Sequence, residues 1–172
     1  MSGFSPVPNV VDFTTFLQNV VGIDPLNLPP TAPVIGYAFN IALSIVNPAL
    51  AAMSGNYFAS GVPYNLGVTT PNVLYALAVY NLGADRVINY APDQTVGGVT
   101  RTYFKEIREA LGISVFVPGV IASSGNSPTS QSTLNPEFMK TMTLGDLQNL
   151  KTPWGREYLN YAMQYGTLWG LS

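Results

Sequence analysis

The stretch PNVLYALAVYNLGADRVINY, from Pro71 to Tyr90, decides the fold of this chain. Thr70 stands directly before its proline, and a Thr N-cap followed by proline at the first helical position favours the start of a helix. One apolar face then recurs at helical spacing, at Val73, Leu77, Tyr80, Ala84 and Val87. We therefore expect a core helix over this stretch, with the rest of the chain packed around it.

Two further helices are expected on its N-terminal side. Val10–Val21 has apolar residues at helical spacing, and the proline-rich segment Gly22–Pro33 cannot continue that helix. The second helix begins near Pro33 and runs to about Ala59, with a kink expected at Pro48. These helices and the central one predict an all-α fold, a small helical bundle.

After Tyr90, the segment APDQTVGGV interrupts the helical pattern. Thr100 is expected to cap a fourth helix that ends at Gly112. This helix has a basic stripe, which could contact an acidic partner or DNA phosphate, but acidic residues are interleaved with it. A solvated amphipathic face explains the pattern better; the stripe and its acids are Arg101, Lys105, Arg108, Glu106 and Glu109.

The C-terminal part of the chain changes in character. Ile113–Lys140 begins like a strand and becomes rich in Ser, Thr, Asn, Pro and Gly, which predicts a long extended arm that crosses to an adjacent chain, or else a loop or linker. A Thr143/Asp146 capping box precedes a short helix, and Thr152-Pro153 begins the last helix. The predicted organisation is a helical core domain (1–112), an arm or linker (113–141), and C-terminal helices with a docking tail (142–172).

The composition is poor in charge. Hydrophobic residues make up 47% of the chain and charged residues only 9%, whereas soluble domains carry about 25%. Between Asp24 and Asp85 there is no acid or base other than tyrosine. Much of the surface is therefore expected to lie against other chains or against lipid, and the net charge of −2 gives no electrostatic reason to bind nucleic acid.

The chain has no cysteine and no histidine. This excludes thiol nucleophiles, histidine-based catalytic triads and the usual zinc sites. No phosphate-binding glycine loop is present either. We expect no enzymatic activity, no cofactor and no metal site.

The uncharged segment Ala32–Met53 is long enough to span a bilayer, which leaves a small membrane-associated protein as an alternative. Asn40, Ser44 and Asn47, however, would form a polar stripe on one helical face, and no Lys or Arg flanks the segment to orient a span. We prefer an interface helix, with one face in the core and the stripe against a neighbouring subunit.

The last helix and the tail contain a second candidate interface. An aromatic stripe follows the helical repeat, at Trp154, Tyr158, Tyr161 and Tyr165. Such a stripe packs into the domain's own core or anchors a protein interface. Beyond Gly166 the apolar tail residues Leu168, Trp169 and Leu171 are expected to dock on another chain, the alternative being that Trp169 folds back on its own domain.

Three segments resemble the head–tail connector (adaptor) proteins of tailed bacteriophages. LKTPWGREYLNYAMQYG, from Leu150 to Gly166, is similar to the T-P-x-G-x-x-Y-L ending of that family. PNVLYALAVYNLGADRVI is similar to its central apolar helix, and GVIASSGNSPTSQSTL, from Gly119 to Leu134, resembles its linker before the closing helix. The histidine common in the central helix of the family is absent here.

The resemblance implies an all-helical subunit without enzymatic activity. Such subunits form a homo-oligomeric ring, with twelve copies expected, in the virion neck between head and tail. The ring would bind the portal protein on one side and tail-side connector proteins on the other. Double-stranded DNA would pass through it without sequence-specific contacts.

Overall fold

The computed structural model describes residue 5 and residues 7–52, 73–96, 99–113 and 144–164. This part of the chain is mostly helical, which confirms the predicted small helical bundle. Its elements, in chain order, are α1 (Val10–Asn19), α2 (Pro33–Ile45), α3 (Ala49–Ala52), α4 (Leu74–Tyr90), β1 (Gln94–Val96), β2 (Val99–Arg101), α5 (Tyr103–Ala110), α6 (Leu144–Asn149) and α7 (Pro153–Gln164). The expected helix starts at Thr70 and Thr143, and nearly all of the arm, lie outside the described residues.

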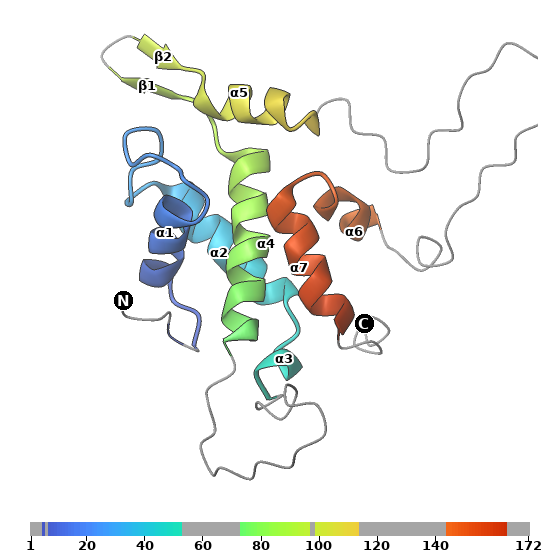
Figure 1. Cartoon of the computed structure of the whole chain (residues 1–172). Helices are drawn as coiled ribbons and strands as arrows, with labels where there is room; N and C mark the ends of the chain where they lie inside the picture. The colour runs from blue at the N-terminus through green and yellow to red at the C-terminus, as the bar shows by residue number, and fades with distance from the viewer. Residues whose placement is uncertain (1–4, 6, 53–72, 97–98, 114–143, 165–172) are drawn as a thin grey trace, which may run out of the picture.

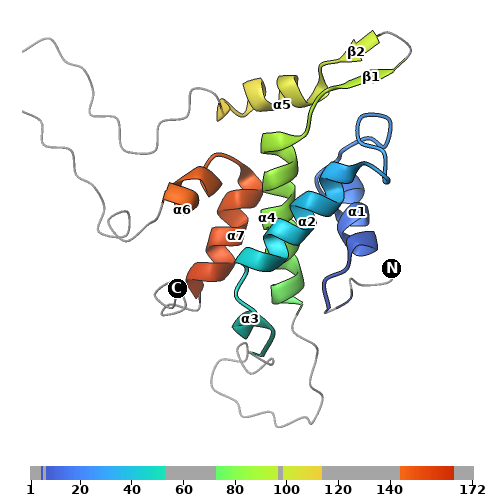
Figure 2. The ribbon, with the colours of Figure 1, turned by 180° about the vertical axis from the view of Figure 1, so that it is seen from behind.

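Helix α4 is the centre of the bundle. Helices α1 and α2 pack on one part of its surface and α7 packs on another, while α5 and the β-hairpin lie at its C-terminal end (Figures 1 and 2). The predicted core helix is confirmed. The sequence analysis, however, expected only one face of this helix to be buried, and the buried surface is wider. Because α4 is enclosed by helices on several sides, its buried residues run almost all round it, from Ala76 to Ile88.

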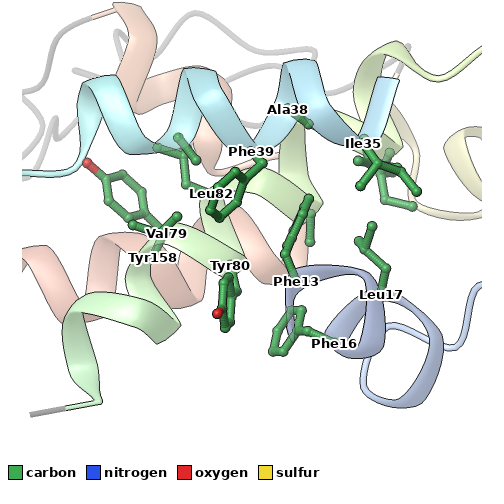
Figure 3. Close-up of a cluster of buried hydrophobic side chains, with 14 of the residues drawn as sticks. Phe13, Phe16, Leu17, Ile35, Ala38, Phe39, Val79, Tyr80, Leu82 and Tyr158 are labelled. Atoms are coloured by element: carbon green, nitrogen blue, oxygen red, sulfur yellow. The ribbon is translucent and has the colours of Figure 1, made fainter. Parts of the chain in front are cut away.

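Aromatic side chains join α1 and α2 to α4 (Figure 3). The ring of Phe13 stacks on Phe39 at 5.7 Å and on Tyr80 at 5.8 Å between centroids. Tyr80 is fully buried, yet its hydroxyl lies 3.2 Å from the backbone amide of Asn9, which caps α1. One tyrosine therefore fills the core and fixes the start of the first helix.

Gly83 makes room for this aromatic cluster. A Cβ at Gly83 would lie 2.7 Å from Cζ of Phe13, closer than side-chain carbons approach one another. The glycine therefore lets the Phe13 ring lie directly against the backbone of α4.

The kink predicted at Pro48 is wrong, because α2 ends before it. Val46 is extended, with ψ 123°, and a separate short helix, α3, begins at Ala49. A proline disfavours helical geometry in the residue before it and has no amide to continue the ladder. The predicted stripe is broken here, since Asn47 lies beyond the end of α2.

The predicted cap at Thr100 is also wrong. Thr100 lies in β2, opposite Thr95 of β1, and the helix starts three residues later with Thr102 as its N-cap. Asp93 satisfies the first amides of α5, since its Oδ1 accepts from the backbone N–H of Phe104 at 2.8 Å. The segment that interrupts the helical pattern is thus a short antiparallel hairpin, and it carries a cap for the next helix.

Arg108 of the basic stripe is used within the fold. Its Nη1 donates to the carbonyl oxygens of Ile88 at 3.1 Å and Ala91 at 2.9 Å, at the C-terminal end of α4. A cation there satisfies open carbonyls and complements the helix dipole. Lys105 instead forms an exposed pair with Glu109 at 3.9 Å, as expected for a solvated face.

Candidate interaction surface

The outward side of α2 is the strongest candidate for an interaction surface. We call it the α2 outer face; it comprises Tyr37, Asn40, Ile41, Ser44 and Ile45. Tyr37 is 71% exposed, and Ile41 and Ile45 are 43% and 48% exposed. Three large apolar side chains are thus interleaved with two small polar ones on a surface that faces solvent in the single chain.

The opposite side of α2 holds this face in place. Ile35, Ala38 and Phe39 are buried against the bundle (Figure 3), and Ala42 is buried as well. The buried residues lie about half a turn of the helix away from the exposed ones. Helix α2 therefore has a buried side and an exposed side, although neither side carries a charge. A helix anchored in this way presents its outer side chains without further ordering of the backbone.

Two of the three predicted stripe residues lie on this face and one does not. Asn40 and Ser44 are exposed. The Ser44 hydroxyl donates to the carbonyl of Ile41 at 2.7 Å, within its own helix. Asn47 follows the end of α2, is half-buried, and lies at the start of the α3 turn, where its carbonyl accepts from Leu50 at 3.1 Å. The sequence stripe missed Tyr37, Ile41 and Ile45, whose apolar character made them look like core.

The aromatic stripe of α7 faces mainly inward in the part that the structure describes. Tyr158 is only 8% exposed and belongs to the chain's own core, while Trp154 and Tyr161 are half-buried against it. Tyr158 thus follows the own-core alternative and leaves little surface for a partner. The other predicted contact residues, Tyr165, Leu168, Trp169 and Leu171, lie outside the described residues.

Tyr161 is also tied to its own helix. Burial, together with a hydrogen bond to Glu157 and the charge of that carboxylate, raises the pKa of the Tyr161 phenol to about 12. The phenol is therefore neutral at every physiological pH. Its hydroxyl is engaged within α7, so what Tyr161 can offer a partner is the exposed part of its ring.

A buried polar cluster joins α7 to α4, and the sequence did not predict it. Asp85 is 0% exposed. Its Oδ1 accepts from the Thr152 hydroxyl at 2.6 Å and from Asn89 Nδ2 at 3.0 Å. Arg86 Nη1 lies 3.7 Å from its Oδ2. Burial raises the pKa of Asp85 to about 6, although the hydrogen bonds and the Arg86 charge act in the opposite direction.

Thr152 and Gly155 explain why the sequence Thr-Pro-x-Gly begins α7. The Thr152 hydroxyl accepts from the Gly155 amide at 2.9 Å, which is the N-cap bond, and thereby confirms the predicted start of this helix. A Cβ at Gly155 would overlap the carbonyl of Asn149 and lie 2.9 Å from Asp85 Oδ1. Only glycine allows the α6–α7 turn to approach α4 this closely. The motif could have indicated a close helix contact, but not its buried acid.

Two further findings concern other classes of site. Within the part of the chain that the structure describes, no group of three or more His, Cys, Asp or Glu residues could hold a metal ion. No helix among these residues is both long and apolar enough to cross a bilayer.

Comparisons with protein-family models, with curated proteins and with solved structures find no match for this chain. The resemblance to head–tail connectors therefore rests on the sequence motifs alone.

Proposed function

We propose that this protein is a structural subunit that assembles with copies of itself into a ring in the neck of a tailed bacteriophage. The observation that carries the proposal is the α2 outer face, a rigid, uncharged and largely apolar surface exposed in the single chain. Exposed apolar patches on an otherwise folded surface mark sites of protein association.

The energetics favour association through such a face. Tyr37, Ile41 and Ile45 expose much of their apolar surface, and covering it would contribute on the order of 1 kcal/mol for each residue before ordering costs. One contact of this size is weak. In a closed ring every subunit makes two contacts, so weak contacts support one another.

The assignment to a phage neck comes from the connector-like motifs. The structure gives the Thr-Pro-x-Gly motif a physical role, since Thr152 and Gly155 fix α7 on α4. In this proposal the ring joins the portal protein to the tail-side connector proteins, and double-stranded DNA passes through it without sequence-specific contacts. The tail residues Leu168, Trp169 and Leu171 would contact the portal or the next subunit. The ring has no enzymatic activity.

Electron microscopy of the purified full chain tests this function. The proposal predicts closed rings with a central opening, and antibodies raised against the chain should label the neck of phage particles from the source of the sequence. Deleting Leu168–Ser172 should leave a folded subunit that no longer binds the portal. Labelling of the capsid faces or the tail tip, or of no particle at all, would contradict the assignment.

A further inference from the structure

The contact between α7 and α4 is built differently from the contacts that α1 and α2 make with α4. Stacked rings fill the core between α1, α2 and α4, where Phe13 lies between Phe39 and Tyr80. Helix α7 packs on another part of α4 (Figures 1 and 2). Among its described side chains the buried apolar ones are Tyr158 and Leu159, and polar groups complete the contact. The bundle therefore has one apolar contact and one mixed contact on the same central helix.

Two hydrogen bonds cross from the α6–α7 pair to adjacent residues of α4. The Thr152 hydroxyl donates to Asp85 Oδ1 at 2.6 Å, and Arg86 Nη2 donates to Asn149 Oδ1 at 3.1 Å. The Asp85 side chain is 0% exposed and that of Arg86 is 11% exposed. The polar part of the docking therefore depends on one carboxyl group and its neighbouring guanidinium.

The ionised form of Asp85 is poorly accommodated in this contact. Its Oδ2 is buried without a hydrogen-bond donor among the described residues, and Arg86 Nη1 stands 3.7 Å from it, beyond hydrogen-bonding distance. A buried carboxylate with an unsatisfied oxygen is costly, and protonation removes its charge. We propose that the α6–α7 pair is a pH-sensitive strap on α4, which a neutral Asp85 holds closed and an ionised Asp85 loosens while the core of α1, α2 and α4 stays folded.

The direction and size of the response follow from the two states of Asp85. Opening of the strap returns the carboxyl group to water and to its ordinary pKa, whereas burial raises the pKa of Asp85 in the closed form to about 6. Protonation therefore favours the closed form, and this preference is lost as pH rises through about 6. Between pH 5 and pH 7.5 the equilibrium constant for opening should rise about tenfold.

The other charges around α4 do not provide this response. Arg86 and Lys151 are the charges that act on Asp85, and both favour its ionised form without outweighing burial. The ionisable groups on the neighbouring elements are absent or engaged elsewhere among the described side chains: α2 and α3 have none apart from the exposed Tyr37, Asp12 of α1 binds Asn9, Arg108 of α5 binds the carbonyl end of α4, and Glu157 of α7 binds Tyr161.

Opening of the strap should also unwind its helices. Helix α6 has six residues and α7 has twelve, and isolated helices of this length are marginal in water. The amides of α7 would therefore exchange with solvent each time the strap opens. The amides of α1 would exchange only when the apolar core itself opens, so the two helices distinguish local opening from unfolding of the whole fold.

Hydrogen exchange of the full chain, followed by mass spectrometry at pH 5 and pH 7.5, tests the proposal. Each rate is divided by the rate of an unstructured chain at the same pH, which removes the intrinsic pH dependence of exchange. Peptides from α7 and α1 are compared in the wild type and in Asp85→Asn, which cannot titrate. Glu109→Gln is the matched control, because it neutralises an acid of α5 whose side chain is 62% exposed.

In the wild type and in Glu109→Gln, corrected exchange of α7 should be about tenfold faster at pH 7.5 than at pH 5, and faster than that of α1 at both pH values. Asp85→Asn should abolish the pH response of α7. Where Asp85→Asn does not fold, the two wild-type readings decide alone.

Equal corrected rates for α7 and α1 would show that α7 opens only with the whole fold, and would overturn the proposal. A wild-type α7 without a pH response, or a response that persists in Asp85→Asn, would overturn it as well. The strap does not depend on the proposed ring, so a wild-type chain that is monomeric would contradict the ring alone.

Discussion

The Thr152 hydroxyl donates a 2.6 Å hydrogen bond to the carboxylate of Asp85, which joins α7 to α4 across 67 residues of sequence. The same hydroxyl accepts from the Gly155 amide and so caps α7. One small side chain therefore starts a helix and docks it. Because Asp85 is buried and its Oδ2 has no hydrogen-bond donor within the described residues, this docking depends on a carboxyl group whose charge is poorly solvated.

The stability of the fold should depend on pH through Asp85. Its pKa in the folded chain, about 6, lies above the ordinary value of 3.8. Because the pKa of Asp85 is higher in the folded chain than in the unfolded chain, protonation of Asp85 stabilises the fold. This stabilisation is complete below the unfolded-state pKa and is lost as pH rises through about 6. Between pH 7.5 and pH 5 the wild type should gain about 1 kcal/mol of unfolding free energy relative to Asp85→Asn, which cannot titrate. Urea unfolding of both proteins at the two pH values measures this difference.

The stabilities of the wild type and Asp85→Asn at pH 7.5 test the same idea in a second way. The amide of Asp85→Asn keeps an oxygen that can accept from Thr152, and it removes the cost of burying a carboxylate whose pKa burial has raised. The variant should therefore be no less stable than the wild type at this pH. A large loss of stability in Asp85→Asn, together with a wild type that shows no relative change with pH, would mean that Asp85 is buried as a well-compensated ion.

The Thr152 hydroxyl should account for most of the contribution of this side chain. Thr152→Val keeps the shape but leaves the Gly155 amide without its cap and removes a donor from Asp85, which should cost about 2 kcal/mol. Thr152→Ser keeps the hydroxyl and should cost less than about 1 kcal/mol. Equal losses in the two variants would show that packing of the methyl group matters and the hydrogen bonds do not.

Gly155 and Gly36 give a matched pair of glycine-to-alanine changes inside helices. A Cβ at Gly155 would overlap the Asn149 carbonyl and lie 2.9 Å from Asp85 Oδ1 of α4, so Gly155→Ala should distort the α6–α7 turn, push it away from α4 and destabilise the fold by about 3 kcal/mol or more. At Gly36 nothing lies within 4 Å of the added carbon. Gly36→Ala should raise stability by roughly 0.5–1 kcal/mol through its better helix propensity. Thermal unfolding compares the two, and a stabilising Gly155→Ala would contradict the close approach.

Arg108 and Lys105 separate a structural cation from a solvated one. Arg108→Gln removes the charge that binds the carbonyls of Ile88 and Ala91, and should lower stability by about 1–2 kcal/mol. Lys105→Gln breaks only an exposed pair and should be close to neutral. Equal effects of the two changes, measured by urea unfolding, would argue against the capping role of Arg108.

The parts of the fold that could be predicted from the sequence are those with local causes. Helical spacing over Val10–Val21 and Pro71–Tyr90 gave helices at these places, and the Thr152-Pro153 pair gave the start of α7. The end of α2 at Ile45 follows equally local rules. The sequence analysis missed this end because it followed the apolar residues beyond Pro48 and treated the proline as a kink rather than as a sign that the helix stops.

The parts that could not be predicted depend on contacts between distant residues. The burial of Asp85 could not be predicted because nothing in the sequence near it shows that α7 covers it. The α2 outer face was found through Asn40 and Ser44, but its apolar residues could not be told from core. Tyr37 and Phe39 are both aromatic and two positions apart, yet only the position of α4 decides that one is 71% exposed and the other 8%.

The native mass of the purified full-length chain, measured over a range of concentrations, tests the central claim most directly. The subunit has a mass of 18.4 kDa. We predict one dominant species at an integer multiple of this mass, twelve subunits being the number that the connector resemblance implies, and its loss in the Tyr37→Lys, Ile45→Lys variant. A wild-type chain that remains an 18.4 kDa monomer up to high micromolar concentration would contradict the account.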